Sequence, residues 1–248
     1  MVFKGLVCVV LLCVSAPAWA QFGDILGGLK DLGLTQEGNL NKEKIISSLS
    51  KNKIASGLKE ALQVGTQNTV NLTGKLNGFL ENEAIKILMP QQLQSLDQAL
   101  RLVGYGPQVD DFVTKMNRAA EQAAPLAQPI FQDAIKSMSF ADVNNILHGG
   151  DTAATDYFQA KTSKQLEAAF RPVVEKTMNQ VGVVAQYKEL VGRYQAIPFV
   201  KTHTFDLDHY VVDKSLNGLF TVLSEEERKI RTDPTAQVTD LLKEVFSK

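Results

Sequence analysis

The chain is poor in cysteine, and this scarcity excludes several kinds of chemistry. It has 2 cysteines in 248 residues, Cys8 and Cys13, and both lie within the first 20 residues together with the single tryptophan, Trp19. The rest of the chain therefore has no thiolate to bind a metal, to attack a substrate or to form a redox pair. A chain of this length can bury enough apolar surface to fold without disulfides.

Long apolar runs and an excess of one charge are also missing. After residue 20 no run is apolar enough to cross a bilayer, which takes about 20 residues. Residues 21–248 carry 25 Lys and Arg against 27 Asp and Glu, because Lys4 is the only ionisable side chain before them. A balanced, interspersed charge gives no footprint for nucleic acid or for an anionic membrane. We therefore expect a soluble protein that does not bind nucleic acid.

The first 20 residues have the pattern of a cleavable export signal. A basic start at Lys4 precedes nine apolar residues, Leu6–Val14, and the stretch ends in the small-x-small triplet Ala18–Ala20. This pattern predicts cleavage after Ala20 and a periplasmic or secreted protein. Lipid attachment at Cys13 is the alternative, although a lipobox wants a small residue where Leu12 stands.

Apolar spacing beyond the signal predicts an all-α, single-domain bundle of about ten helices over residues 35–248. The clearest element is a long helix near 162–194, with apolar residues at steps of three and four and a capping box formed by Thr162 and Gln165. Before this domain, residues 21–34 form a glycine-rich amphipathic arm. The arm is expected to pack on the body of the protein, on a partner or on a lipid surface as a peripheral contact.

Helix boundaries are predicted at several capping and breaking residues. Ser139 with Asp142, and Ser224 with Glu227, have capping-box spacing, and Asp233 can cap a last helix that begins at Pro234. Prolines inside the apolar stripe of 109–138 predict a break or kink near Ala124–Pro129.

Two clusters could carry chemistry, and each also has a plain structural interpretation. The candidate metal ligands are His203, Asp206, Asp208 and His209, but no zinc-enzyme spacing is present and Asp206 also suits a helix N-cap. His148–Thr152 (HGGDT) could hold an anion at a helix N-terminus, or it could be a glycine helix end with a left-handed cap, followed by Asp151 at the next helix start. Complete catalytic or nucleotide motifs are missing.

A cleft between helices is the remaining candidate site. Arg118 and Glu121 stand one helical turn apart among alanines, which fits an ion pair on a helix face or the wall of an internal cleft. The stripe Ile54–Leu76 has small residues in its middle, including Gly65, which permit close helix packing or leave room for a ligand. With Asn68, these residues are the candidates for lining a cleft.

Four strings resemble a family of exported bacterial proteins, domain-of-unknown-function family 4197. They are GLKEAL at 57–62, MNRAAE at 116–121, ILHGGDTAATDYF at 146–158 and LNGLFTVLSEEERKIRTDP at 216–234. The likeness extends from about Asp24 to Phe246 and implies a helical, single-domain protein of the bacterial envelope. It implies no activity and no site residue.

The sequence favours a non-enzymatic binding or interaction protein without a cofactor. Such a protein would hold an apolar small molecule, an amphipathic ligand or a partner helix between its helices. The alternative is a metal-assisted hydrolase that uses the cluster His203, Asp206, Asp208 and His209.

Overall fold

The computed structural model describes residues 37–180, 185, 188, 189, 191, 192 and 205–233. The chain divides into two compact units, residues 1–51 and residues 52–248, and the candidate site lies in the second. All regular elements of the described residues are helical: α2 (Glu37–Gly74), η1 (Gln91–Leu93), α3 (Gln94–Leu102), α4 (Gly106–Ala123), η2 (Ala124–Leu126), α5 (Ala127–Lys136), α6 (Phe140–Leu147), α7 (Ala153–Gln180) and α9 (Leu207–Thr232).

The all-α prediction is confirmed, whereas the number of helices is smaller in the described residues than the ten expected. The signal at 1–20, the arm at 21–34 and the helix predicted from Pro234 lie outside the described residues. The fold is therefore described from α2 to α9, with both helices included.

The long central helix begins earlier than its sequence pattern indicates. α7 starts at Ala153, so Thr162 lies inside it rather than at its N-cap. The Thr162 hydroxyl donates to the Phe158 carbonyl one turn back, at 2.6 Å. A threonine inside a helix satisfies its hydroxyl in this way, and the capping-box prediction at this position is wrong. Most of residues 181–194 lies outside the description.

Two boundary predictions are confirmed and one is wrong. α4 gives way to the 3₁₀ turn η2 and then to α5 at the proline-containing stretch 124–129. Ser139 and Asp142 form a reciprocal capping box at the start of α6. Ser224, however, lies inside the continuous helix α9, where its hydroxyl donates to the Thr221 carbonyl. The carboxylate of Glu227 is used elsewhere, as described below.

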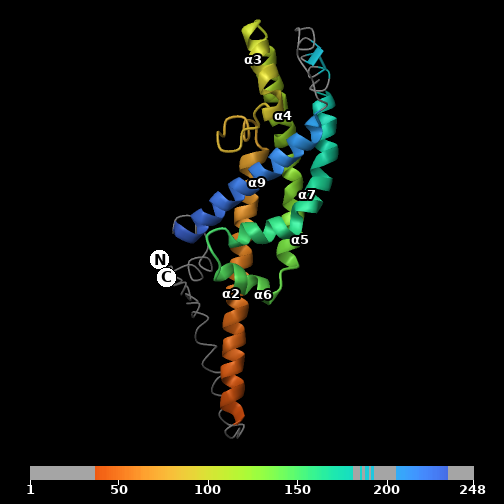
Figure 1. Cartoon of the computed structure of the whole chain (residues 1–248). Helices are drawn as coiled ribbons and strands as arrows, with labels where there is room; N and C mark the ends of the chain where they lie inside the picture. Colours follow the sequence, from red (N-terminus) through yellow and green to blue (C-terminus); the bar gives the residue numbers. More distant parts are fainter. Residues whose placement is uncertain (1–36, 181–184, 186–187, 190, 193–204, 234–248) are drawn as a thin grey trace, which may run out of the picture. The chain divides into compact units, whose positions relative to one another are not determined.

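The core forms where α7 packs against α9, α4, α5 and α6 (Figure 1). Phe131 of α5 meets Phe158 of α7 edge to face, with ring centroids 5.1 Å apart, and Phe220 of α9 lies at 6.3 Å. α2 joins the same unit through Asn68, which donates to Glu226 of α9, and through Gly74, which lies against Pro125. The contacts between α2 and α9 position the candidate site.

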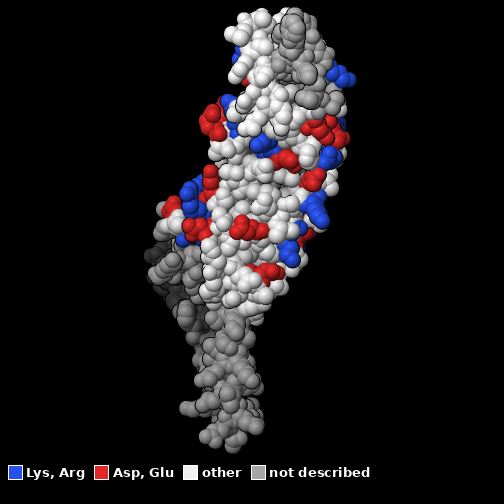
Figure 2. Space-filling view, viewed as in Figure 1, with Lys and Arg blue, Asp and Glu red and all other residues white. Residues whose placement is uncertain are grey.

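Charges of both signs are interspersed over the described surface that Figure 2 shows. Within the described chain, no helix combines the length and the apolar character that a membrane span requires.

Candidate functional site

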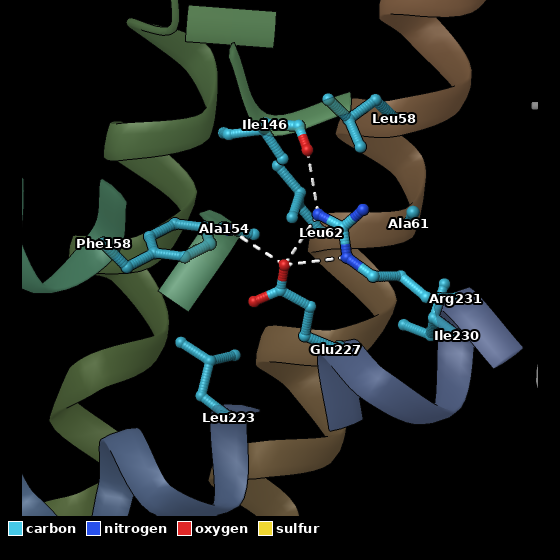
Figure 3. A pocket seen from close by; sticks show the side chains of 11 residues that line it. Leu58, Ala61, Leu62, Ile146, Ala154, Phe158, Leu223, Glu227, Ile230 and Arg231 are labelled. Atoms are coloured by element: carbon cyan, nitrogen blue, oxygen red, sulfur yellow. Dashed lines mark hydrogen bonds and ion pairs between the residues drawn. The ribbon is translucent and has the colours of Figure 1, made fainter. Parts of the chain in front are cut away.

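A pocket lies between α2, α6, α7 and α9 (Figure 3). Its volume is about 350 Å³ when the part open to solvent is counted, but only about 20 Å³ lies clear of the side chains, room for about one water molecule. Apart from one carboxylate and one guanidinium, the wall is formed by apolar and small residues: Leu58, Ala61, Leu62, Gly65, Ile146, Ala154, Phe158, Leu223 and Ile230. The site is therefore an apolar pocket that its own side chains nearly fill.

Small residues of α2 explain how the pocket is closed. Ala61 and Gly65 lie one turn apart on α2 and face Ile230 of α9, and a Cβ atom at Gly65 would stand 3.3 Å from Ile230 Cδ1. The missing side chain lets α9 approach α2 closely. The Ile230 side chain therefore fills the space between the two helices beside the pocket.

The polar end of the pocket is a buried carboxylate, Glu227 of α9. Its Oε1 accepts the backbone N–H of Ala154 at 2.9 Å, and its Oε2 accepts both the N–H and the hydroxyl of Thr155 at 2.8 Å. Glu227 is 7% exposed. A carboxylate at the first turn of α7 satisfies helix N–H groups that lack helical partners and interacts favourably with the helix dipole.

Arg231 completes this network one turn further along α9. Its Nε and Nη2 donate to Glu227 Oε1 at 3.0 and 2.8 Å, and Nη2 also donates to the Ile146 carbonyl at 2.9 Å, near the end of α6. The pair thus connects the end of α6, the start of α7 and α9 (Figure 3). Both partners of a buried ion pair are satisfied here, which such a pair needs in order not to be destabilising.

The glycine-rich turn before α7 has a different role from either sequence interpretation. The helix N-terminus that could have held an anion already binds the chain's own Glu227. α6 ends at His148, and neither Gly149 nor Gly150 has a positive φ, so the predicted left-handed glycine cap is wrong. Gly149 is required for space, since a Cβ atom there would lie 2.5 Å from the Ala153 Cβ.

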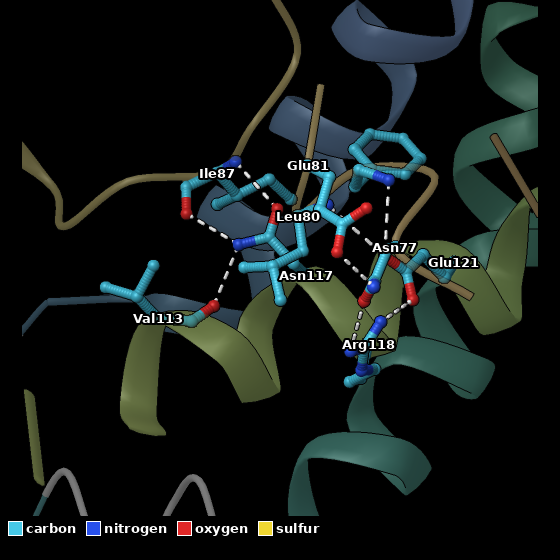
Figure 4. A network of polar contacts seen from close by, with 9 residues as sticks. Asn77, Leu80, Glu81, Ile87, Val113, Asn117, Arg118 and Glu121 are labelled. Carbon is cyan, nitrogen blue, oxygen red and sulfur yellow. Dashed lines mark hydrogen bonds and ion pairs between the residues drawn. The ribbon is translucent and has the colours of Figure 1, made fainter. Parts of the chain in front are cut away.

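Asn117, Arg118 and Glu121 of α4 form a second polar network that holds the segment after α2 (Figure 4). Glu121 Oε1 accepts the backbone N–H groups of Phe79 and Leu80 at 3.2 and 3.3 Å, and its Oε2 accepts from Arg118 at 2.6 Å.

The other two side chains of this network also reach the segment. Arg118 donates in turn to Asn77 Oδ1 at 2.5 Å. The Asn117 side chain accepts the Ile87 N–H at 2.9 Å and donates to the Ile87 carbonyl at 2.8 Å, as a neighbouring strand would. This network therefore fixes an irregular segment of backbone.

The predicted cleft residues are divided between these places. Gly65 lines the apolar pocket. Arg118 and Glu121 pair with each other as expected but lie in the α4 network rather than among the pocket residues. Asn68 donates to Glu226 Oε2 at 3.0 Å and holds α2 on α9. The structure thus brings one of the four candidates to the pocket.

The candidate metal cluster does not assemble in the part that the structure describes. His203 lies outside it, and no group of three or more ligating side chains is found among the described residues. Asp206 is the N-cap of α9 and accepts the His209 N–H at 3.0 Å, as its alternative interpretation predicts. Burial raises the pKa of the Asp208 carboxyl above its ordinary value, and the neighbouring Glu175 raises it further.

Sequence reasoning missed Glu227, Arg231 and Asn117 as central residues. The i,i+4 spacing of Glu227 and Arg231 on one helix face is a signal that could have indicated the pair. Their partners on α6 and α7 are more than 70 residues away in the chain, so the spacing alone does not indicate the helix cap.

Fold and site together define a class: a helical protein with an apolar pocket between packed helices and a buried ion pair at its end. The chain belongs to the family described as "Protein of unknown function (DUF4197)", whose model matches residues 48–247. The resemblance in the four sequence strings is thereby confirmed. No curated protein and no solved structure matches the chain.

Proposed function

We propose that this protein is an exported, non-enzymatic binding protein that takes an apolar or amphipathic small molecule between α2 and α9. The observation that supports the proposal is the pocket wall, in which the apolar side chains of four helices converge on one buried ion pair. Ligand sites in proteins are typically concave and mostly apolar, with few polar groups that fix orientation.

The state of Glu227 favours binding over catalysis. Its two oxygens accept from two backbone N–H groups, one hydroxyl and the Arg231 guanidinium. A general base has to be within reach of a substrate proton, and this carboxylate is engaged with its own helix cap. Its role in the proposed site is to keep the end of the pocket rigid.

Binding requires side chains of the pocket to move, because the space that they leave has room for about one water molecule. At Gly65 the Ile230 side chain fills the space between α9 and α2, since a Cβ atom there would stand 3.3 Å from Ile230 Cδ1. We expect a ligand to displace Ile230 and to occupy the space between Leu58, Leu62 and Leu223. Displacing one side chain is a smaller change than separating the helices.

An enlarged pocket provides the test. Ile230→Ala removes the side chain that fills the space between α2 and α9. This variant should bind the dye 1-anilinonaphthalene-8-sulfonate more tightly than wild type, with a dissociation constant about tenfold lower if about 1.4 kcal/mol of binding free energy is gained. The matched control is Ile135→Ala, which removes a similarly buried isoleucine of α5 that does not line the pocket. Equal dye affinity in the two variants would count against the pocket as the site.

The proposed location is the periplasm or the medium, and it rests on the signal pattern of residues 1–20. N-terminal sequencing of protein recovered from those fractions should give Gln21 as the first residue. A chain that begins at a lipid-modified Cys13 would replace this proposal with a membrane-anchored form.

A further inference from the structure

The chain contains two Asn–Gly pairs, Asn77–Gly78 and Asn217–Gly218. This dipeptide is prone to deamidation, because a glycine has no side chain to keep its backbone nitrogen away from the side-chain amide of the asparagine before it. The structure places the two pairs in different surroundings. Asn77 lies in the turn that follows α2, whereas Asn217 lies inside the continuous helix α9.

The turn after α2 requires both residues of its Asn–Gly pair. Asn77 has φ 66°, a left-handed conformation that asparagine adopts more readily than most residues with a side chain. A Cβ atom at Gly78 would stand 2.3 Å from the Leu72 carbonyl oxygen, so the turn has no room for any side chain there. The backbone therefore imposes a chemically labile pair on this position.

The α4 network and its neighbours hold the side-chain amide of this asparagine (Figure 4). Arg118 Nη2 donates to Asn77 Oδ1 at 2.5 Å, and Asn77 Nδ2 donates to the Glu81 carboxylate. The Gly78 N–H, whose nitrogen is the nucleophile in deamidation, donates to the Lys75 carbonyl at 2.9 Å. Both reacting groups are thus hydrogen-bonded elsewhere, so the reaction requires a local opening of the turn.

The two asparagines differ in backbone rather than in access to water. Asn77 is half-buried and lies along an open groove of about 540 Å³, and the Asn217 side chain is exposed. The backbone of Asn217, however, is fixed in the middle of α9, where a Cβ atom at Gly218 would lie 2.5 Å from Phe79 Cε1. An attack by the Gly218 nitrogen needs a non-helical backbone, so a packed part of α9 would have to unfold first.

We propose that Asn77 is a deamidation site of the folded protein and that Arg118 and Glu81 slow the reaction by holding the amide. In the reaction the Gly78 nitrogen forms a bond to Asn77 Cγ, the Cγ–Nδ2 bond breaks, and the amide proton of Gly78 leaves with this nitrogen as ammonia. Water then opens the resulting cyclic imide at one of its two carbonyls. The product is either an aspartate or an isoaspartate at position 77.

Either product changes the place where α4 holds the chain. An aspartate sets a second negative charge beside Glu81. An isoaspartate adds one carbon to the backbone shortly before the N–H groups of Phe79 and Leu80, which Glu121 binds. The reaction therefore loosens the segment after α2 as the protein ages, and it involves none of the residues that line the apolar pocket.

Incubation of the purified full chain in neutral buffer, followed by trypsin digestion and mass spectrometry with fragmentation, tests the site. Trypsin cleaves after Lys75 and after Lys214, so the two asparagines fall in separate peptides of one sample. Asn77 should deamidate about tenfold faster than Asn217, or more, because a turn opens more often than a packed helix does. Equal rates, or a faster reaction at Asn217, would overturn the proposal.

Two variants test the hold on the amide. Glu81→Ala and Arg118→Met each remove one partner of the Asn77 side chain. Each should raise the rate at Asn77 by about threefold to tenfold, because one fewer hydrogen bond opposes the opening of the turn. Glu83→Ala is the matched control, since it removes a carboxylate that is 85% exposed from the same segment and should leave this rate unchanged.

The rate at Asn217 shows whether a variant has merely become less stable, because that rate follows the opening of α9. A faster reaction at Asn77 with an unchanged rate at Asn217 supports the proposal. Equal increases at both asparagines would assign the effect to global unfolding and overturn the hold, as would an unchanged rate at Asn77 in both variants. A slower reaction in Arg118→Met would also overturn it, since the guanidinium would then assist the attack.

Discussion

Glu227, near the end of α9, accepts both the backbone N–H and the hydroxyl of Thr155, 72 residues earlier in the chain at the first turn of α7. A helix start usually finds its cap in the preceding residues. Here a distant helix supplies it, so the N-terminus of α7 can form completely only when α9 is packed against it. Secondary structure and tertiary packing are therefore coupled at this point.

Removing this carboxylate should be among the most destabilising single changes in the protein. Glu227→Ala leaves buried N–H donors and the Arg231 guanidinium without their acceptor, which costs about 3–5 kcal/mol of unfolding free energy. Urea denaturation measures the loss. Glu83→Ala is the control, since that side chain is 85% exposed and its ion pair with Lys86 is long, at 3.8 Å. A loss below about 1 kcal/mol in Glu227→Ala would show that the cap is replaced by water.

The Asn117 contact with Ile87 should govern the order of the segment after α2. Asn117→Ala leaves a buried N–H and a buried carbonyl unpaired, at about 1–3 kcal/mol each. Hydrogen exchange of the Ile87 amide should become faster, while amides of α7 change less. Asn145→Ala, at an exposed position of α6, is the matched control. Unchanged protection of Ile87 would mean that other contacts hold the segment.

The pH dependence of stability should carry a signature of Asp208. Its folded pKa is raised by burial and then by Glu175 and Asp206. A carboxyl whose pKa is higher in the folded than in the unfolded state stabilises the fold below its ordinary pKa, and this contribution is lost as the pH rises through the raised value. Asp208→Asn cannot ionise, so it should be more stable than wild type at about pH 7 and equal to it at about pH 3.

The gain in Asp208→Asn should stay below about 1 kcal/mol, because the side chain is partly exposed to solvent and its charge interactions are screened. Asp133→Asn, whose side chain is 76% exposed, should show no such crossover. In the opposite result, Asp208→Asn is less stable than wild type at neutral pH and added zinc increases the difference in stability. That result would support a metal site at the start of α9.

Sequence patterns predicted the parts of this fold that depend on neighbouring residues. Ser139 and Asp142 cap α6 with side chains three residues apart, and Asp206 caps α9 in the same local way. Pro125 lies where α4 gives way to α5. A proline has no backbone N–H to donate to a helical hydrogen bond, and this property does not depend on distant residues. The signal that indicates each of these features is contained in a few consecutive residues.

The same capping spacing does not indicate a helix start where tertiary packing decides the partners of the side chains. Thr162 and Ser224 have capping spacing, yet both lie inside helices, where a hydroxyl donates back to a carbonyl of the preceding turn. The acid three residues after Ser224 is Glu227, whose partner is set by the packing of α7 on α9. The sequence indicates that Gly65 lines a cleft, but its partner Ile230, 165 residues later, is identified only in the folded chain.

A side chain introduced at Gly65 should close the pocket without disturbing its polar end. Gly65→Val places its branched carbons against Ile230, while Gly150→Val is the matched control because nothing lies within 4 Å of a Cβ atom there. Helix propensity also improves at position 65, which offsets part of the crowding. We expect a protein that folds with unchanged Glu227 contacts but does not bind the dye.

Native mass spectrometry of the full chain, purified from producing cells without detergent, tests the binding proposal most directly. We expect a small-molecule adduct on wild-type protein that is released on denaturation. The same adduct should be retained by Gly150→Val and lost from Gly65→Val. A wild-type protein free of any adduct, or an adduct that Gly65→Val binds as well as wild type does, would contradict a ligand site between α2 and α9.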